Sequence, residues 1–332
     1  MRVAVIGAGS FGTSLAFVLG SKGYDVKLWA RDAEHVASVN AQHENVRYLP
    51  GAKLPATIIA TSSFAEAVAG AELVVAATPS HAARAVFGAA DGLIPDGVPI
   101  VTASKGIEEG TLLVPTEVLE SVLPERYHPY LAAISGPSFA REIVAGYPTA
   151  VTVAASWLRV AKRTQEAFTA PTFRTYTSTD VVGVQLGAAL KNVMAIGSGI
   201  VDGLGLGHNA RAALITRGLA EMTRLAVARG GSPVTLSGLA GRGDLVLTCT
   251  GDLSRNRTVG LELGKGKKLA EVLAGMKQVA EGVKTARSAH DLAAKCGVEA
   301  PITQAVFEVV HEGKDARRAV MELMGRNPKA EF

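Results

Sequence analysis

The chain has 332 residues, of which 48% are hydrophobic and 19% are charged. This composition excludes an intrinsically disordered protein and provides enough apolar material for two buried cores. The formal net charge of +4 favours anionic ligands, but the one basic cluster, Lys265-Gly-Lys267-Lys268, is short and lacks interleaved aromatic residues, so we predict no nucleic-acid partner.

Histidine and cysteine give no sign of a metal or disulfide framework. The seven histidines are scattered without the spacing of metal ligands, and we predict no metal. Cys249 and Cys296 cannot form a disulfide framework, and two isolated cysteines suit a reducing compartment. We therefore predict a cytoplasmic location.

The first segment predicts a dinucleotide-binding site. An apolar strand over residues 2–6 leads into Gly7-Ala-Gly9-Ser-Phe-Gly12, helical periodicity follows over 11–19, and a second strand is expected over 25–29. In this pattern Gly7 permits a tight turn, Gly9 lets the backbone approach a pyrophosphate, and Gly12 allows close helix packing. An export signal is the alternative, but four glycines interrupt the continuous apolar helix that such a signal requires.

The end of the second strand bears on the choice between NAD and NADP. Arg31 stands about 20 residues beyond the glycine loop, where a ribose-recognising residue is expected. An arginine there pairs with the 2′-phosphate of NADP, which favours NADP(H). The neighbouring Asp32 would accept the ribose hydroxyls of NAD, and a solvated Arg31 is a third alternative, so NADP(H) and NAD(H) both stay open.

The order of elements predicts an α/β fold: an N-terminal doubly wound Rossmann-type sheet domain over residues 1–178, then an all-α C-terminal domain over 179–332. Apolar runs bounded by turn residues recur between helical stretches, which is typical of a parallel sheet. Beyond residue 171 proline is absent until Pro233, and helical periodicity dominates. We expect further strands over 57–60, 73–77, 100–103, 131–134, 150–154 and 172–177, and helices over 157–168, 181–200, 210–228, 269–273, 282–294 and 301–310.

Residues 181–201 are long and apolar enough to raise the question of a membrane span. Gln185, Lys191, Asn192 and Ser198 interrupt the segment, and no aromatic residue flanks it. We therefore predict a central helix buried within its own domain and no stable membrane insertion.

Lys191 is the first candidate for catalysis. It is the one charged residue in the apolar 181–201 segment, and its neighbours one turn away on the helix are small or apolar. Desolvation lowers the pKa of a lysine toward the range useful for acid–base catalysis. The alternative is a lysine that reaches solvent or pairs with a distant carboxylate.

Three further segments carry candidate residues. The glycine-rich stretch from Gly238 to Arg257 is interpreted as an anion-binding loop, in which Arg255 grips a phosphate, Ser254 and Asn256 add hydrogen bonds and Asp244 orients Lys191; an exposed surface loop is the alternative. The segments 102–106 and 135–140 each follow a strand at its carboxyl end, where open α/β sheets bind ligands. Each of these two is equally compatible with an ordinary turn.

Taken together, these motifs resemble the bacterial-type NAD(P)-dependent glycerol-3-phosphate dehydrogenase family across essentially the whole chain. The resemblance rests on Gly7-Ala-Gly-Ser-Phe-Gly12-Thr, Leu28-Trp-Ala-Arg31, Arg47-Tyr-Leu-Pro-Gly51, Ser104-Lys-Gly-Ile-Glu108, Ser135-Gly-Pro-Ser-Phe-Ala-Arg-Glu142, Leu190-Lys-Asn192, Gly238-Leu-Ala-Gly-Arg-Gly-Asp244-Leu, Ser254-Arg-Asn-Arg257 and Val279-Ala-Glu-Gly-Val-Lys284, in that order.

The resemblance implies an oxidoreductase that interconverts dihydroxyacetone phosphate and sn-glycerol 3-phosphate for glycerophospholipid synthesis. It makes Lys191 the proton donor and acceptor, positioned by Asp244, with Lys105 polarising the carbonyl. Homodimers are the commonest oligomers, and we expect one here. Implied substrate ligands are Lys105, Gly136, Ser138, Lys191, Asp244, Ser254, Arg255 and Asn256, and implied cofactor ligands are Gly7, Gly9, Ser10, Phe11, Gly12, Arg31, Tyr48, Lys105, Ala140, Arg255, Val279 and Glu281.

Two other functions compete. A 3-hydroxyacid or 6-phosphogluconate dehydrogenase also combines a Rossmann domain, a helical domain and a catalytic lysine, and substrate preference separates it from the first hypothesis. A non-catalytic nicotinamide sensor is a different class of protein, but it has no need of Lys191 in an apolar helix beside Asp244.

Overall fold

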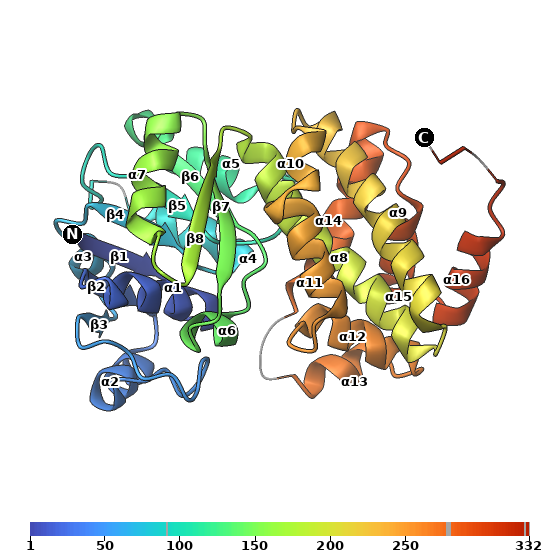
Figure 1. The fold of residues 1–332 in the computed structure, drawn as a ribbon, viewed down its shortest axis with the longest axis horizontal. Helices are drawn as coiled ribbons and strands as arrows, with labels where there is room; N and C mark the ends of the chain where they lie inside the picture. The colour runs from blue at the N-terminus through green and yellow to red at the C-terminus, as the bar shows by residue number, and fades with distance from the viewer. Residues whose placement is uncertain (91, 277–279, 329, 332) are drawn as a thin grey trace. The chain divides into compact units, whose positions relative to one another are not determined.

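The computed structural model describes residues 1–90, 92–276, 280–328 and 330–331. The chain divides into two compact units (Figure 1). The first comprises Met1–Glu108 and Leu113–Gln185, and the second comprises Glu109–Leu112 and Leu186–Phe332. The first unit thus extends past residue 178 into the helix that begins at Val181.

The first unit is built on an eight-stranded sheet in the order β3-β2-β1-β4-β5-β6-β7-β8. All neighbouring strands are parallel except β6 and β7, which are antiparallel. The order 3-2-1-4-5 is that of a Rossmann-type sheet, so the predicted fold class is confirmed. The strands are β1 (Arg2–Ile6), β2 (Asp25–Trp29), β3 (Ile58–Thr61), β4 (Leu73–Ala76), β5 (Ile100–Thr102), β6 (Leu131–Ser135), β7 (Thr149–Ala155) and β8 (Phe173–Ser178).

Helices cover both faces of this sheet, which explains why its central strands are continuously apolar. Side chains alternate along β1: Val3 and Val5 join one buried core, while Ala4 and Ile6 join the other. The helices of this unit are α1 (Ser10–Ser21), α2 (Ala33–Gln42), α3 (Phe64–Val68), α4 (Ser80–Gly88), α5 (Pro115–Glu120), the 3-10 helix η1 (Glu125–Tyr130), α6 (Ala140–Val144) and α7 (Leu158–Phe168).

The second unit is helical throughout its regular structure (Figure 1). Its elements are α8 (Val181–Gly203, from Leu186 on), α9 (Gly207–Ala228), α10 (Pro233–Ser237), the π-helical turn η2 (Leu239–Gly243), α11 (Asp244–Thr250), α12 (Arg255–Gly264), α13 (Leu269–Ala274), α14 (Glu281–Cys296), α15 (Pro301–His311) and α16 (Ala316–Met324).

Helix α8 is long and apolar enough to cross a membrane by length and composition, as its sequence suggested. Every residue of its most apolar window is buried inside the protein. A helix that is buried on all sides by its own domain is apolar all round, so its composition needs no membrane to explain it. A single helix of this kind is weak evidence for a membrane span.

The stretch from Gly238 to Arg257 is not the loop that its glycines suggested. It forms the π turn η2, helix α11, a short non-helical turn over residues 251–254 and the start of α12. The expectation of a loop was wrong because glycine there provides close packing: a Cβ at Gly241 would overlap the backbone of Leu236. The glycine content of this stretch therefore reflects packing between elements. Anion binding by this stretch stays a prediction.

Candidate active site

The glycine loop has the geometry that pyrophosphate binding requires. Gly7 adopts φ +123°, and a Cβ there would lie 2.5 Å from the carbonyl oxygen of Ala77. A Cβ at Gly12 would overlap the carbonyl oxygen of Gly7, whereas one at Gly9 would meet no atom within 4 Å. Gly9 also caps α1 without a side chain, and the first turn of α1 carries no acidic residue. The N-terminal amides of α1 therefore suit a dinucleotide pyrophosphate.

Asp32, which follows β2, caps the N-terminus of α2 with its side chain. Its carboxylate accepts hydrogen bonds from the backbone N–H groups of Glu34 and His35, and it lies 2.9 Å from the Arg47 guanidinium. The hydrogen bond from His35 N–H is the main reason why the pKa of Asp32 is lowered. Arg31 beside it is exposed.

The loop after α2 is tied to the glycine loop by Asn45, a fully buried side chain that the sequence gave no reason to single out. Its amide donates to the carbonyl oxygen of Ala8 and to Thr13 Oγ1, both at 2.8 Å. Ser10 Oγ donates to the carbonyl oxygen of Tyr48 at 2.5 Å. Two predicted cofactor residues, Ser10 and Tyr48, are thus neighbours.

The other candidates of the first unit follow the carboxyl ends of β5 and β6. Half-buried Lys105 has its ammonium 5.3 Å from the centre of the Phe11 ring, which brings two predicted cofactor residues together. Ser138 Oγ donates to the carbonyl oxygen of Gly136, and Ala140 begins α6. These residues lie at the sheet edge where open α/β folds bind ligands.

In the second unit, Lys191 forms a buried polar cluster with residues of α11. Lys191 is 5% exposed and Asp244 is 1% exposed. The Lys191 ammonium donates to Asp244 Oδ1 at 2.5 Å and to Thr248 Oγ1 at 2.8 Å, and Thr248 Oγ1 donates to the Asp244 carbonyl oxygen at 2.6 Å. A carboxylate so close stabilises the charged ammonium against the cost of burial. Asp244 directly follows the π turn, a feature often found at functional sites.

The first turn of α12 carries two arginines. Ser254 caps the helix by accepting the Arg257 backbone N–H, and Arg255 and Arg257 stand in the first turn, where no acidic residue occurs. The N-terminal amides of a helix favour an anion, and an arginine beside them can add paired hydrogen bonds to it. Ser254 and Asn256 are buried and Arg255 is exposed.

Glu281 and Asn256 are linked through the first turn of α14. The Gly282 N–H donates to Asn256 Oδ1 at 2.9 Å, which leaves the NH₂ of that amide as the donor for a ligand. A Cβ at Gly282 would lie 2.7 Å from both Asn256 Oδ1 and the Asn192 carbonyl oxygen. Glu281 is the first residue of this helix. Val279, a predicted cofactor residue, lies outside the described residues.

Thr248 is the contact of Lys191 that the sequence analysis missed. It stands four residues after Asp244, so both side chains lie on one face of α11. A helix prediction for residues 244–250 would have found it. Within the described part of the chain, no group of three or more His, Cys, Asp or Glu residues could hold a metal ion.

A Rossmann-type sheet with a pyrophosphate-binding loop, accompanied by a helical unit with a buried lysine–carboxylate pair, defines a dinucleotide-dependent oxidoreductase. Comparison with known proteins gives the family. The model for the NAD-dependent glycerol-3-phosphate dehydrogenase N-terminus matches residues 2–161, and the model for its C-terminus matches residues 180–321. The chain belongs to the NAD-dependent glycerol-3-phosphate dehydrogenase family.

Individual relatives agree with this assignment. The chain is 62% identical to a glycerol-3-phosphate dehydrogenase [NAD(P)+] of Myxococcus xanthus, covering 100% of this chain and 99% of that one. It is 56% identical to the enzyme of the same name from Anaeromyxobacter dehalogenans, covering 100% of both. A crystal structure of glycerol-3-phosphate dehydrogenase from Coxiella burnetii has a TM-score of 0.92 at 41% identity, covering 98% of this chain and 99% of that one.

Proposed function

We propose that this protein catalyses the reversible, NAD(P)-dependent interconversion of dihydroxyacetone phosphate and sn-glycerol 3-phosphate. The observation that carries the proposal is the buried contact of Lys191 with Asp244 and Thr248. An ammonium held in an apolar helix can give a proton to a substrate oxygen and take it back.

Lys191 stabilises the negative charge that grows on the C2 oxygen during reduction and then transfers its proton to that oxygen. The hydride for C2 would come from the nicotinamide of the cofactor, whose pyrophosphate the glycine loop of residues 7–12 would hold. Asp244 and Thr248 fix the ammonium by two hydrogen bonds, so its position does not depend on the substrate. In the oxidation direction, neutral Lys191 takes the proton of the C2 hydroxyl.

The substrate phosphate is held by the first turn of α12. Arg255 offers a guanidinium that pairs with two phosphate oxygens, and Ser254 and Asn256 add hydrogen bonds beside the positive end of the helix. Binding at the phosphate, remote from the reacting carbon, orients that carbon. Gly136 and Ser138 also contact the substrate, and Lys105 polarises its carbonyl.

The cofactor is bound by the glycine loop of residues 7–12, and the capping role of Asp32 supports NADP(H) as the preferred form. A carboxylate already occupied by two backbone N–H groups and an arginine is a poor acceptor for ribose hydroxyls. Arg31 then recognises the 2′-phosphate. Further cofactor contacts fall to Ser10, Phe11, Tyr48, Lys105, Ala140, Arg255, Val279 and Glu281.

The direct test is reduction of dihydroxyacetone phosphate, followed by the loss of NADPH or NADH absorbance. We expect Lys191→Met to lower kcat by about 10²- to 10⁴-fold while NADPH binding, measured by fluorescence, stays intact. Lys295→Met, an exposed lysine of α14, is the matched control and should keep full activity. Wild-type protein that reduces this ketone with neither cofactor would refute the proposal, and a fully active Lys191→Met variant would refute the role of Lys191.

The cellular setting follows from the same activity. We propose a role in lipid synthesis, because sn-glycerol 3-phosphate is the backbone of glycerophospholipids. A cytoplasmic homodimer is part of the proposal, and the free thiols of Cys249 and Cys296 fit a reducing compartment. Light scattering of the purified protein at several concentrations tests the dimer.

A further inference from the structure

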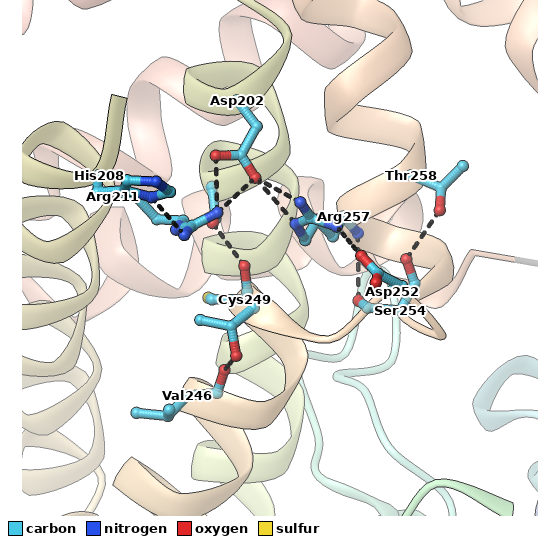
Figure 2. A network of polar contacts seen from close by, with 11 residues as sticks. Asp202, His208, Arg211, Val246, Cys249, Asp252, Ser254, Arg257 and Thr258 are labelled. Carbon is cyan, nitrogen blue, oxygen red and sulfur yellow. Dashed lines mark hydrogen bonds and ion pairs between the residues drawn. The ribbon is translucent and has the colours of Figure 1, made fainter. Parts of the chain in front are cut away.

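Asp202, at the end of α8, binds arginines from two other helices (Figure 2). Arg257 of α12 donates through Nε at 2.9 Å and Nη2 at 2.8 Å, both to Asp202 Oδ2. Arg211 of α9 donates to both oxygens, to Oδ1 at 3.1 Å and to Oδ2 at 3.3 Å. The side chain of Asp202 is 14% exposed and that of Arg257 is 16% exposed. This network is therefore shielded from solvent, and its geometry is more constraining than that of a surface ion pair.

Arg257 connects this network to the start of α12. Its backbone N–H is accepted by Ser254 Oγ, so the same residue closes the cap of α12 and ties that helix to α8. Between Ser254 and Arg257 lie Arg255 and Asn256, to which the proposed function assigns the substrate phosphate. The guanidinium of Arg257 is engaged by Asp202 and Asp252, which suits it to hold the protein in place rather than to bind a ligand.

Asp202 and Lys191 lie on one face of α8. Eleven residues separate them, which is about three helical turns, so their side chains leave the helix in nearly the same direction. Helix α8 thus carries both the proposed proton donor, Lys191, and the carboxylate that binds α12, Asp202, on the same side. Any movement of α12 along or around α8 changes the distance between the proton donor and the phosphate site.

Glycines hold the backbones of α8 and α12 close together along most of their contact. A Cβ at Gly199 of α8 would overlap the Arg257 carbonyl oxygen, and one at Gly260 of α12 would overlap the Ile196 carbonyl oxygen. One helical turn further along, a Cβ at Gly203 would overlap the Leu261 carbonyl oxygen, and one at Gly264 would lie 2.5 Å from the Ile200 carbonyl oxygen. The two helices meet backbone to backbone along this seam. The Asp202–Arg257 contact adds a side-chain tie to the first turn of α12, the turn that also carries Arg255 and Asn256.

We propose that Arg257 is a positioning residue: held by Asp202, it sets the place of Arg255 and Asn256 relative to Lys191 and so controls affinity for the substrate phosphate. The inference rests on the proposed function, because Arg255 and Asn256 must bind that phosphate. Arg257 itself touches neither substrate nor cofactor in this scheme.

The test is the kinetics of Arg257→Met with dihydroxyacetone phosphate. We expect KM, and the inhibition constant of sn-glycerol 3-phosphate, to rise on the order of tenfold, because a displaced anchor weakens binding of ground state and transition state alike. The midpoint of the kcat–pH profile should not move, since the Lys191–Asp244 contact stays intact. Asp202→Asn should shift KM in the same direction, and the double variant should be no worse than Arg257→Met alone.

Arg211→Met is the matched control, because Arg211 binds the same carboxylate but comes from α9 and not from α12, the helix that carries Arg255 and Asn256. It should lower the unfolding temperature and leave KM unchanged. All rates are measured well below the unfolding temperature of each variant, and Asp202→Asn carries the test should Arg257→Met not fold.

Two outcomes would overturn the proposal: a KM of Arg257→Met within twofold of wild type, or an equal rise of KM in Arg211→Met. Either would show that the network stabilises the fold without controlling the site. Inactivity of the wild type toward dihydroxyacetone phosphate would instead refute the proposed function.

Discussion

Burial sets the reactivity of the two cysteines. Cys249 is fully buried on α11, and this burial raises the pKa of its thiol to about 12, although the positive charge of Lys191 opposes the shift. Cys296 is partly exposed at the end of α14. The reactive thiolate form is therefore almost absent at Cys249.

We predict that iodoacetamide modifies the native protein at pH 8 on Cys296 alone, as measured by peptide mass spectrometry. Cys249 should react only after denaturation. Cys296→Ser is the control and should remain unmodified in the native state. Rapid labelling of native Cys249 would mean that α11 opens readily around the candidate site.

Arg31 should separate the two cofactors. We predict that Arg31→Ala raises KM for NADPH by roughly 10- to 100-fold, the loss expected for hydrogen bonds to a charged phosphate. KM for NADH should change little, because NADH lacks that phosphate. Steady-state kinetics with both cofactors measure this, and equal effects on NADPH and NADH would contradict a contact with the 2′-phosphate.

At the scale of elements, the seam between α8 and α12 predicts a large cost for a single methyl group. We expect Gly260→Ala to lower the free energy of unfolding by about 1–3 kcal/mol, because the helices must separate to admit a Cβ beside the Ile196 carbonyl. Gly88→Ala is the matched control: this exposed glycine ends α4 and has open space around the new atom. Denaturant unfolding gives the free energy of unfolding of both variants. Equal values for Gly260→Ala and Gly88→Ala would show that the two helices can separate at little cost.

Elements with a strong apolar period could be predicted from the sequence, and the short ones could not. The strands of the sheet and the long helices of the second unit lie where the pattern placed them, within a few residues. Helices α11 and α12 were missed because glycines stand in the π turn before α11 and within α12. These glycines allow close contact with the backbone of another element, a relation that neither segment reveals on its own. A propensity scale counts such glycines against a helix.

The same limit applies to the candidate site. The pairing of Lys191 with Asp244 was predicted, and the structure brings the two together. Thr248 and the anchoring contact of Arg257 were not, since both follow from helices that the sequence did not indicate. The roles of the remaining site residues stay predictions until they are tested by substitution.

At the scale of the whole molecule, α8 runs without a break from the first unit into the second. Its start is held within the first unit by Gln185, whose side-chain oxygen accepts the Thr116 N–H at 2.8 Å while its NH₂ donates to Thr116 Oγ1 at 2.7 Å. Both side chains are buried. The helix is therefore fastened at its first turns by a reciprocal pair.

We predict that Gln185→Leu lowers the free energy of unfolding by about 1–3 kcal/mol, because it leaves the buried Thr116 N–H without an acceptor. NADPH binding should persist, since Gln185 is not among the predicted cofactor residues. Gln42→Leu, on the exposed end of α2, is the control. An unchanged stability of Gln185→Leu would show that water replaces the lost amide.

The π turn before Asp244 has a consequence for how such a gene can change. A π turn holds one residue more than the α-helical turn it replaces, and an α-helix advances about 100° per residue. Loss of one codon between positions 239 and 243 would let the turn relax to α-helix and swing the carboxylate of Asp244 away from Lys191. We therefore expect natural selection to remove insertions and deletions from this glycine-rich stretch. Its composition resembles that of surface loops, whose length usually varies among related proteins.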